Sequence, residues 1–120
     1  MEWLTISTST ELVRVATDEI LYVVADGNYS DLVMTDGTVH KMTFQIHYFE
    51  EYFGRLENNP FSRVNRSLIV NRQYVRVINL TERLLKFGGP NVSATHRPLR
   101  VGRDSLKKLK DEMTDYDNRH

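Results

Sequence analysis

The sequence predicts a mainly β domain built from small antiparallel sheets of short strands, with one main helix and a shorter helix near the C-terminus. Three observations support this: short apolar runs of strand length, glycine-containing turn signals between them, and only two segments with helical spacing of apolar residues. The length agrees, because 120 residues with 40% hydrophobic side chains suffice for one core. We therefore expect a single domain over residues 1–120.

Eight runs rich in Val, Ile, Leu and Tyr are bounded by turn residues and are expected to form strands. They cover residues 12–16, 20–25, 29–35, 38–43, 67–70, 75–80, 84–87 and 92–95. Asp36-Gly37 lies between two of these runs and is a typical hairpin signal, because glycine accepts a positive φ. Residues 26–28 (Asp-Gly-Asn) and 88–91 (Gly-Gly-Pro-Asn) mark two further turns.

The main helix is expected over residues 44–57, with Thr43 as its cap. Phe49 and Phe53 lie one helical turn apart and begin an apolar face. The Asn-Asn-Pro sequence at 58–60 is expected to end the helix, because proline cannot continue it. Several aromatic residues lie in this segment, and packing in the core explains them better than a platform for stacked bases.

A shorter helix is expected over residues 104–113, with Asp104 as its cap. Leu106, Leu109 and Met113 fall on one face of this helix, while the lysines between them face solvent or a partner. The chain after Met113 is polar, and we expect it to be frayed.

The charges are unevenly distributed along the chain, although the formal net charge is zero. Residues 60–110 contain twelve Lys and Arg side chains but only two acidic ones. Residues 1–59 contain three basic and ten acidic side chains, and residues 111–120 contain one and four. A strongly basic block favours a polyanionic partner, although a solvated charged surface would have the same composition.

Several classes of function find no support in the sequence. Cysteine is absent, which excludes disulfides, thiolate metal sites and cysteine nucleophiles. The four histidines have no close metal-ligand spacing, and Ser67 has no nearby histidine to activate it, so we expect no metal, no cofactor and no enzymatic activity. No apolar run approaches the ~18 residues of a membrane span, and the N-terminus lacks secretory-signal features. We therefore expect a cytoplasmic protein without a membrane partner.

The segment from Phe61 to Asn71 is the most informative part of the sequence. Its apolar residues can fix a loop and the strand that follows, and hydrogen-bond donors lie between them. These donors are Arg63, Asn65, Arg66 and Ser67. Arginine has a planar fork that pairs with guanine O6 and N7, asparagine can pair with adenine, and serine and backbone amides suit phosphate oxygens. The segment therefore predicts a loop that presents polar groups to a DNA groove.

This segment resembles the central pattern of the LytTR family of bacterial DNA-binding domains, Phe-x-Arg-Val/Ile-His-Arg-Ser followed by an aromatic residue, Leu/Ile, Val and Asn. Residues 20–29 (Ile-Leu-Tyr-Val-Val-Ala-Asp-Gly-Asn-Tyr) resemble the opening block of the family, and Thr43 with its hydrophobic neighbour resembles the start of the family's helix. Residues 101–108 resemble its closing block. The resemblance spans residues 12–110, with the blocks in the same order.

The resemblance implies small antiparallel sheets and DNA binding through loops that enter successive major grooves, usually at direct repeats in promoters. It implies a first loop at Asn28, Tyr29 and Ser30, and base contacts from Arg66 in a second loop and Arg103 in a third. Arg72, just after the central pattern, is a candidate for phosphate contact. The predicted DNA-contacting residues are therefore Asn28, Tyr29, Arg63, Asn65, Arg66, Ser67, Arg72 and Arg103.

Three positions depart from the family pattern. Asn65 stands where the family usually has histidine, and Leu68 stands where it usually has an aromatic residue. Asn65 can still form hydrogen bonds, so this difference concerns sequence preference more than DNA binding itself. The glutamate expected before the first loop is replaced within Val24-Ala25. Asn71 is expected to have a structural role as a turn cap.

We therefore predict sequence-specific binding of double-stranded DNA, as the output domain of a bacterial transcription regulator of the response-regulator, two-component type. The resemblance implies that two copies can pair on adjacent repeats, and that a receiver domain, a sensor domain or a partner kinase pathway can act with this domain. The sequence fits both a stand-alone module and a part of a longer regulator. The alternative is a β-rich module that binds RNA or an acidic protein, but the alternating exposed aromatics of an RNA-binding sheet are not found.

Overall fold

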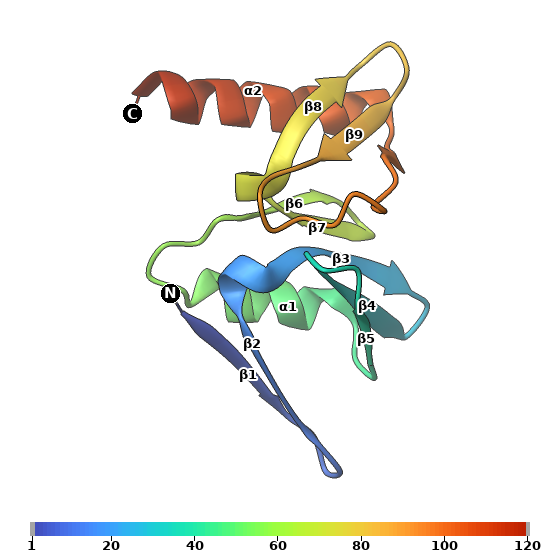
Figure 1. Ribbon diagram of the computed structural model, residues 1–120, viewed down its shortest axis with the longest axis vertical. Coiled ribbons are helices and arrows are strands. Elements are labelled where there is room, and N and C mark those ends of the chain that lie inside the picture. The colour runs from blue at the N-terminus through green and yellow to red at the C-terminus, as the bar shows by residue number, and fades with distance from the viewer. Residues whose placement is uncertain (1, 120) are drawn as a thin grey trace.

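The computed structural model describes residues 2–119, which form ten strands, two α-helices and two short 3-10 helices. The strands make three antiparallel sheets, which Figure 1 shows as successive layers along the long axis of the molecule. The predicted fold class, mainly β with small antiparallel sheets and two helices, is confirmed. No helix in the described range is long and apolar enough to cross a membrane.

The middle layer is a five-stranded sheet in the order β5-β4-β3-β7-β6. Its strands are β3 (Ile20–Asp26), β4 (Tyr29–Met34), β5 (Val39–Met42), β6 (Phe61–Asn65) and β7 (Leu68–Asn71). The β3–β4, β4–β5 and β6–β7 pairs are hairpins, whereas β3 and β7 are distant in sequence and pair with Val23 opposite Ile69. This long-range pairing joins the two halves of the chain.

The side chains of β3 and β7 point alternately to the two faces of the middle sheet, and each face carries a hydrophobic core. Val23 and Ile69 belong to the first core, whereas Val24, Leu68 and Val70 contribute to the second. Successive side chains of a strand point to opposite faces, so both central strands can be apolar throughout. The almost unbroken apolar runs in the sequence are explained by this two-sided burial.

The first core is closed by α1 (Ile46–Gly54) and by a two-stranded sheet of β1 (Trp3–Ser7) and β2 (Leu12–Ala16). Phe49 and Phe53 of α1 are fully buried there, as the aromatic spacing predicts. In Figure 1, α1 and the β1–β2 hairpin lie below the middle sheet.

The second core lies under α2 (Arg103–Arg119) and a three-stranded sheet of β8 (Val75–Asn79), β9 (Leu84–Phe87) and β10 (Leu99–Arg100). Leu106 and Leu109 of α2 are buried in it. Figure 1 places this layer above the middle sheet.

The main helix is shorter than the predicted range of 44–57. Gln45, not Thr43, precedes the first turn, and its backbone is extended. The Ser30 hydroxyl donates to the Phe44 carbonyl at 2.8 Å, which ties this segment to the sheet and keeps it out of the helix. At the other end the helix stops at Gly54, before the predicted Asn-Asn-Pro signal.

The C-terminal helix is longer than the predicted range of 104–113, and the expected fraying after Met113 is wrong. The helix begins at Arg103 and continues to Arg119. Its second half is held to the rest of the domain, because the Ser62 hydroxyl donates to Glu112 at 2.6 Å and the Arg72 guanidinium lies 5.9 Å from the centre of the Tyr116 ring. Sequence periodicity alone does not show such polar contacts.

Seven of the eight predicted strands are present, with ends that shift by a residue or two. Residues 92–95 instead form a loop, because the Ser93 amide donates to the Thr35 carbonyl and the Ser93 hydroxyl bonds to Thr95. Three strands were not predicted, namely β1, β6 and the two-residue β10. The Asp36-Gly37 hairpin turn is confirmed, with Gly37 at a φ of 94°.

Asn71 is a buried polar link between β7 and β3, which confirms its predicted structural role. Its side-chain oxygen accepts from the Gln73 amide at 3.0 Å and caps the short helix at 72–74. Its amide nitrogen donates to the Ile20 carbonyl at 2.9 Å. Asn71 is fully buried, and its bond to Ile20 is shielded from water.

Replacing Asn71 by alanine is expected to destabilise the domain. The change removes the side-chain donor to the buried Ile20 carbonyl and the cap of the Gln73 amide, which costs about 1–3 kcal/mol. Urea denaturation of Asn71→Ala measures this loss, with Asn91→Ala, an exposed asparagine in a loop, as the matched control. Equal unfolding midpoints for both variants would contradict the assigned role.

Candidate nucleic-acid interface

The first predicted loop is a two-residue turn between β3 and β4. Asp26 pairs with Tyr29, so Gly27 and Asn28 form the turn, with Gly27 at a φ of 62°. The Asn28 side-chain oxygen accepts from the Gln45 amide at 3.3 Å. Asn28 and Tyr29 are both exposed, whereas Ser30 is fully buried and bonds to the main chain before α1. The turn therefore presents Asn28 and Tyr29 to solvent and turns Ser30 inward.

Lys41 on β5 neutralises the acidic residues beside this first turn. Its ammonium lies 2.9 Å from a carboxylate oxygen of both Asp26 and Asp31. These hydrogen bonds, that to Asp26 first, raise the pKa of Lys41 above its ordinary value. The same ammonium lies 5.9 Å from the centre of the Tyr29 ring. The turn is therefore less negative than its sequence indicates.

The second loop joins β6 to β7, and Arg63 holds it in shape. The Arg63 guanidinium donates to the Asn65 carbonyl at 2.6 Å and to the Arg66 carbonyl at 2.7 Å. A third bond, of 3.1 Å, joins it to Glu50 on α1. The Asn65 side-chain oxygen accepts from the Ser67 amide at 2.8 Å. Arg63 and Asn65 therefore fix the backbone that presents Arg66 and Ser67, which are exposed.

The third predicted contact, Arg103, is the first residue of α2. Buried side chains flank it, because Val101 and Leu106 belong to the second core. The Val101 amide donates to the Arg83 carbonyl at 3.0 Å, which ties the approach to the helix to the β8–β9 turn. Gly102 and Arg103 are exposed. Contacts of Val101 before it and of Leu106 after it thus fix the position of the Arg103 backbone.

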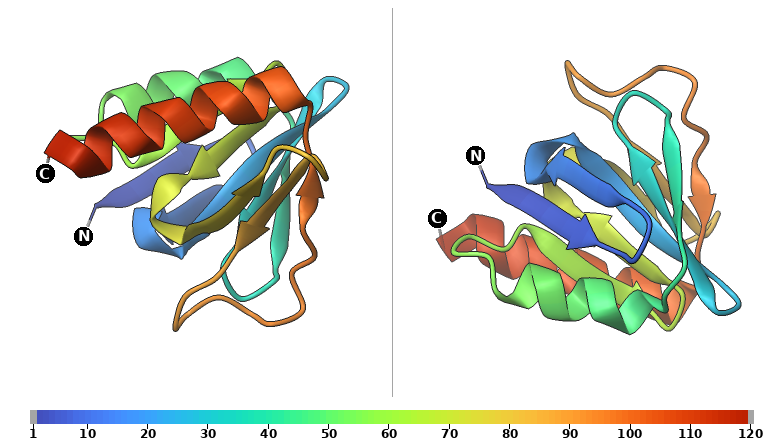
Figure 2. Two further views of the ribbon diagram at one scale, coloured as in Figure 1. Left: turned by 90° about the horizontal axis from the view of Figure 1, so that it is seen from above. Right: turned by 90° about the horizontal axis from the view of Figure 1, so that it is seen from below.

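The three loops lie at one end of the molecule. The Ala25 amide donates to the Ser67 carbonyl at 2.8 Å, which places the first two turns side by side. Ser62 at the start of β6 bonds to Glu112 in the second half of α2, so the first residue of α2 lies toward the other end of β6, where the second loop begins. Figures 1 and 2 show all three on the same side of the molecule, away from both chain termini. We call this surface, formed by residues 27–29, 65–67 and 102–103, the turn edge.

Two predicted site residues are not part of the turn edge: Arg63 lies behind its second loop, and Arg72 lies away from it. Arg72 follows the opposite end of β7, where its guanidinium donates to the Phe61 carbonyl at 3.0 Å and the Asn59 carbonyl at 2.8 Å. A further bond of 2.7 Å reaches Ser62, and a Glu112 oxygen is 3.8 Å away. The geometry therefore gives Arg72 the task of joining β6, β7 and α2.

Arg83 and Arg100 also lie close to the turn edge, although sequence reasoning gave no role to Arg83. Arg83 has a φ of 58°, which costs a residue other than glycine about 1–2 kcal/mol. Arg100 pairs with Leu84, the residue after Arg83. Neither the charge block nor the family pattern singles out either residue, because their proximity to Arg103 arises only when β10 pairs with β9.

The opposite end of the molecule is acidic. A groove of about 920 Å³ opens there between the end of α2, the chain after α1 and the short helix after β2. Four acidic residues line it, namely Glu2, Asp18, Glu57 and Asp117. The separation of acidic and basic ends gives the domain a field that favours one orientation toward a polyanion.

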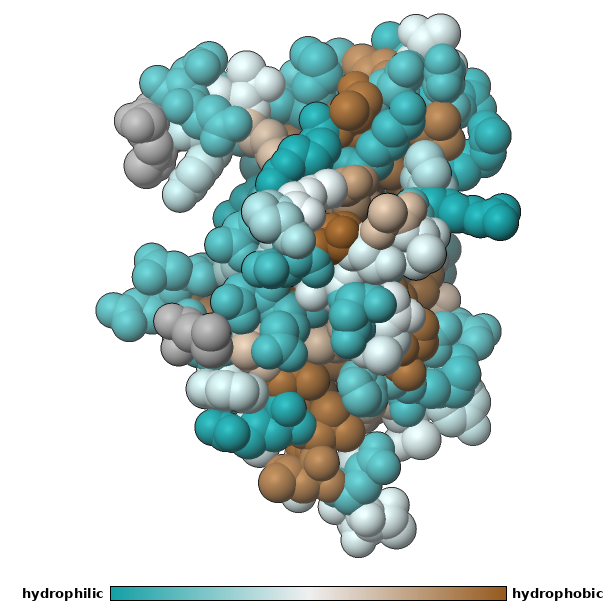
Figure 3. All heavy atoms as spheres, in the orientation of Figure 1, coloured by the Kyte–Doolittle hydropathy of each residue, from teal (hydrophilic) through white to brown (hydrophobic). Residues whose placement is uncertain are grey.

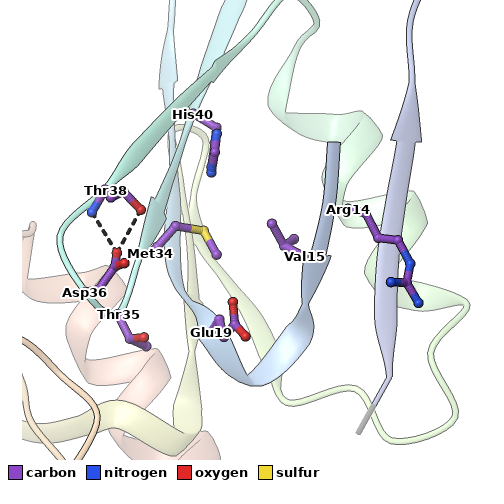
Figure 4. Close-up of a pocket in the computed structure, with 8 residues that line it drawn as sticks. All are labelled: Arg14, Val15, Glu19, Met34, Thr35, Asp36, Thr38 and His40. Carbon is purple, nitrogen blue, oxygen red and sulfur yellow. Dashed lines mark hydrogen bonds between the residues drawn. The ribbon is translucent and has the colours of Figure 1, made fainter. Parts of the chain in front are cut away.

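A smaller cavity of about 410 Å³, shown in Figure 4, lies between β2 and the β4–β5 hairpin. Asp36 in its wall accepts from the Thr38 amide at 2.9 Å and the Thr38 hydroxyl at 2.7 Å. These bonds, the backbone one first, lower the pKa of Asp36. The carboxylate thus maintains the hairpin turn. No cluster of three metal-ligating side chains occurs within residues 2–119.

Apolar and hydrophilic side chains are unevenly distributed over the face of the molecule in Figure 3. In Figure 3, apolar side chains gather mainly in the lower half of the view, around the β1–β2 hairpin, where Trp3 and Leu12 are exposed. Hydrophilic side chains cover much of the side that the turns form. The turn edge thus resembles a surface for polar contacts more than an apolar docking face.

Comparison with known families gives a match over most of the chain. The family described as the LytTr DNA-binding domain matches residues 10–114. This chain belongs to the LytTR family. The family is one of DNA-binding domains. The resemblance of the three sequence blocks is therefore confirmed at the level of the family.

Structural comparison shows the same fold. The LytTr DNA-binding domain of a response regulator from Bacillus cereus has a TM-score of 0.66 and 17% sequence identity to this LytTR domain. The match covers 92% of this chain and 95% of that chain. No curated protein sequence matches significantly. At this level of identity the solved structure supports the fold of the domain.

Replacing Arg63 by alanine is expected to loosen the second loop without unfolding the domain. Two carbonyls lose a charged donor, so the Ser67 amide should exchange its hydrogen roughly tenfold faster. Native-state hydrogen exchange measures this effect. Arg55→Ala, at an exposed arginine after α1, is the control. Unchanged exchange at Ser67 in the Arg63 variant would contradict this account.

Proposed function

We propose that this LytTR domain reads specific sequences in double-stranded DNA with the turn edge, as the output domain of a bacterial transcription regulator. The observation that supports this most is the position of Arg66 and Arg103. Both arginines are exposed at the same end of the molecule, and neither makes a side-chain hydrogen bond or ion pair with the described residues. Their guanidinium groups are therefore available to a partner.

Each group on the turn edge has a chemistry that fits a part of DNA. The guanidinium forks of Arg66 and Arg103 match guanine O6 and N7 in the major groove. Asn28 can bond to a base edge through its amide, and the Ser67 hydroxyl suits a phosphate oxygen. Tyr29 supplies a flat ring at the side of the same groove.

The remaining predicted site residues act through the backbone that they hold. Arg63 and Asn65 shape the loop that contains Arg66, so we assign them to positioning. The Asn65 side-chain oxygen is already an acceptor, which leaves its amide hydrogens for DNA. Arg72 supports the interface from a distance by locking α2 against β6.

The biological setting follows from this mode of binding. The turn edge of a single domain can contact only a short DNA sequence. Two copies on adjacent direct repeats in a promoter would double the number of base pairs that are contacted. In a response regulator, a receiver domain or a sensor would control how often two copies meet, within a two-component pathway in the cytoplasm. Pairing on repeats would also raise affinity through effective concentration.

Replacing Arg66 by alanine is expected to weaken binding and to relax the preference at one base position. The loss should be about 1–3 kcal/mol, or roughly 5- to 150-fold in affinity. Selection of duplexes from a random pool by the unmodified domain supplies the probe. Gel mobility with that duplex then gives the affinity of each variant.

Arg55→Ala is the matched control, because Arg55 is an exposed arginine that follows α1, away from the turn edge. It should bind the selected duplex like the unmodified domain. An Arg66→Ala variant with unchanged affinity and base preference would overturn the assignment. Single-stranded RNA that outcompetes the duplex at equal salt would overturn the choice of duplex DNA.

A further inference from the structure

The turn between β8 and β9 holds a charged residue in a conformation that favours glycine. Asn79 and Leu84 are the last paired residues, and the Asn79 side-chain oxygen accepts from the Glu82 amide at 2.9 Å. Arg83 then takes a φ of 58°, the one positive φ at a residue other than glycine within residues 2–119. Glycine would adopt this backbone without the steric cost that a Cβ brings.

The Arg83 side chain forms no polar contact with the described residues that would offset this cost. Arg83 is exposed, and within the described residues its guanidinium has neither a hydrogen-bond acceptor nor an ion-pair partner. A strained residue that persists without internal contacts points to a role outside the folded chain.

Pairing of β10 with β9 brings Arg83 next to two other arginines. The Arg83 carbonyl accepts from the Val101 amide, two residues before Arg103, and Arg100 lies opposite Leu84. All three arginines are exposed, and none forms an ion pair with a residue in the described range. Like charges on neighbouring segments repel one another, so an anion near them would be stabilising. Figures 1 and 2 show the β8–β9 turn beside the start of α2.

We propose that Arg83 and Arg100 bind the DNA phosphate backbone beside the groove that Arg103 enters, as a fourth contact beyond the three loops. This inference rests on the proposed function, since it needs Arg103 at the DNA. The backbone of Arg83 is bonded through its carbonyl to the segment that leads into Arg103, so contact of Arg103 with the duplex would bring the β8–β9 turn close to it. The contact adds affinity for any duplex sequence and does not select bases.

The test uses Arg83→Gly and Arg83→Asn in the full chain, because both residue types accept positive φ and neither has a charge. Arg55→Gly removes one exposed charge elsewhere and is the matched control. The probes are the duplex selected from a random pool and a shuffled duplex of the same composition. Affinities are measured over a range of salt concentrations, and Tm is measured for each protein.

We expect both Arg83 variants to bind both duplexes about tenfold more weakly near 0.1 M salt, since one fewer counterion is released. The slope of log affinity against log salt should become shallower by about 0.9. Tm should stay equal or rise by a few degrees, because the strain is relieved. Binding would thus fall while stability does not.

The binding and Tm measurements distinguish a failure of the proposed function from a failure of the fourth contact. If the unmodified domain binds no duplex, the proposed function fails. If it binds but both Arg83 variants match Arg55→Gly within twofold, the fourth contact is wrong. A loss confined to the selected duplex would also overturn it, because a phosphate contact acts on both. A lower Tm in both variants would show that the arginine supports the fold.

Discussion

The pairing of β3 with β7 is the constraint on which the interface depends. Both strands contribute side chains to two cores, so a shift of one residue would send each set of apolar side chains to the wrong face. Register is therefore fixed from both sides. The β3–β4 and β6–β7 turns continue from these two strands, so the distance between the two turns is fixed as well. The bond from the Ala25 amide to the Ser67 carbonyl joins them.

Six arginines of the basic block fall into two groups by what their guanidinium groups contact. Arg63 and Arg72 donate to main-chain carbonyls and hold segments together. Arg66, Arg83, Arg100 and Arg103 are exposed at or near the turn edge. The basic block of the sequence therefore contains both structural charges and charges that are exposed to solvent. Arg63 and Arg72 order the main chain before any partner binds. The chain therefore loses less conformational entropy when the exposed arginines contact a ligand.

Local patterns in the sequence predict most of the fold, and non-local contacts explain the differences. Strand runs, the Asp36-Gly37 hairpin and the aromatic face of α1 follow from periodicity and turn chemistry. The late start of α1 depends on the bond from Ser30, and the length of α2 depends on contacts from Ser62 and Arg72. These partners are distant in sequence. The family pattern located Arg66 and Arg103, but it could not separate Arg63 from Arg66, nor reveal Arg83, because only the folded backbone distinguishes them.

Titration of the isotope-labelled domain with the selected duplex, followed by backbone amide shifts, tests most directly whether the turn edge meets DNA. The account predicts the largest changes at residues 27–29, 65–67 and 102–104, with little change around Glu57 and Asp117 in the acidic groove. Saturable binding that shifts the groove or the β1–β2 hairpin, and leaves those three segments unchanged, would contradict it.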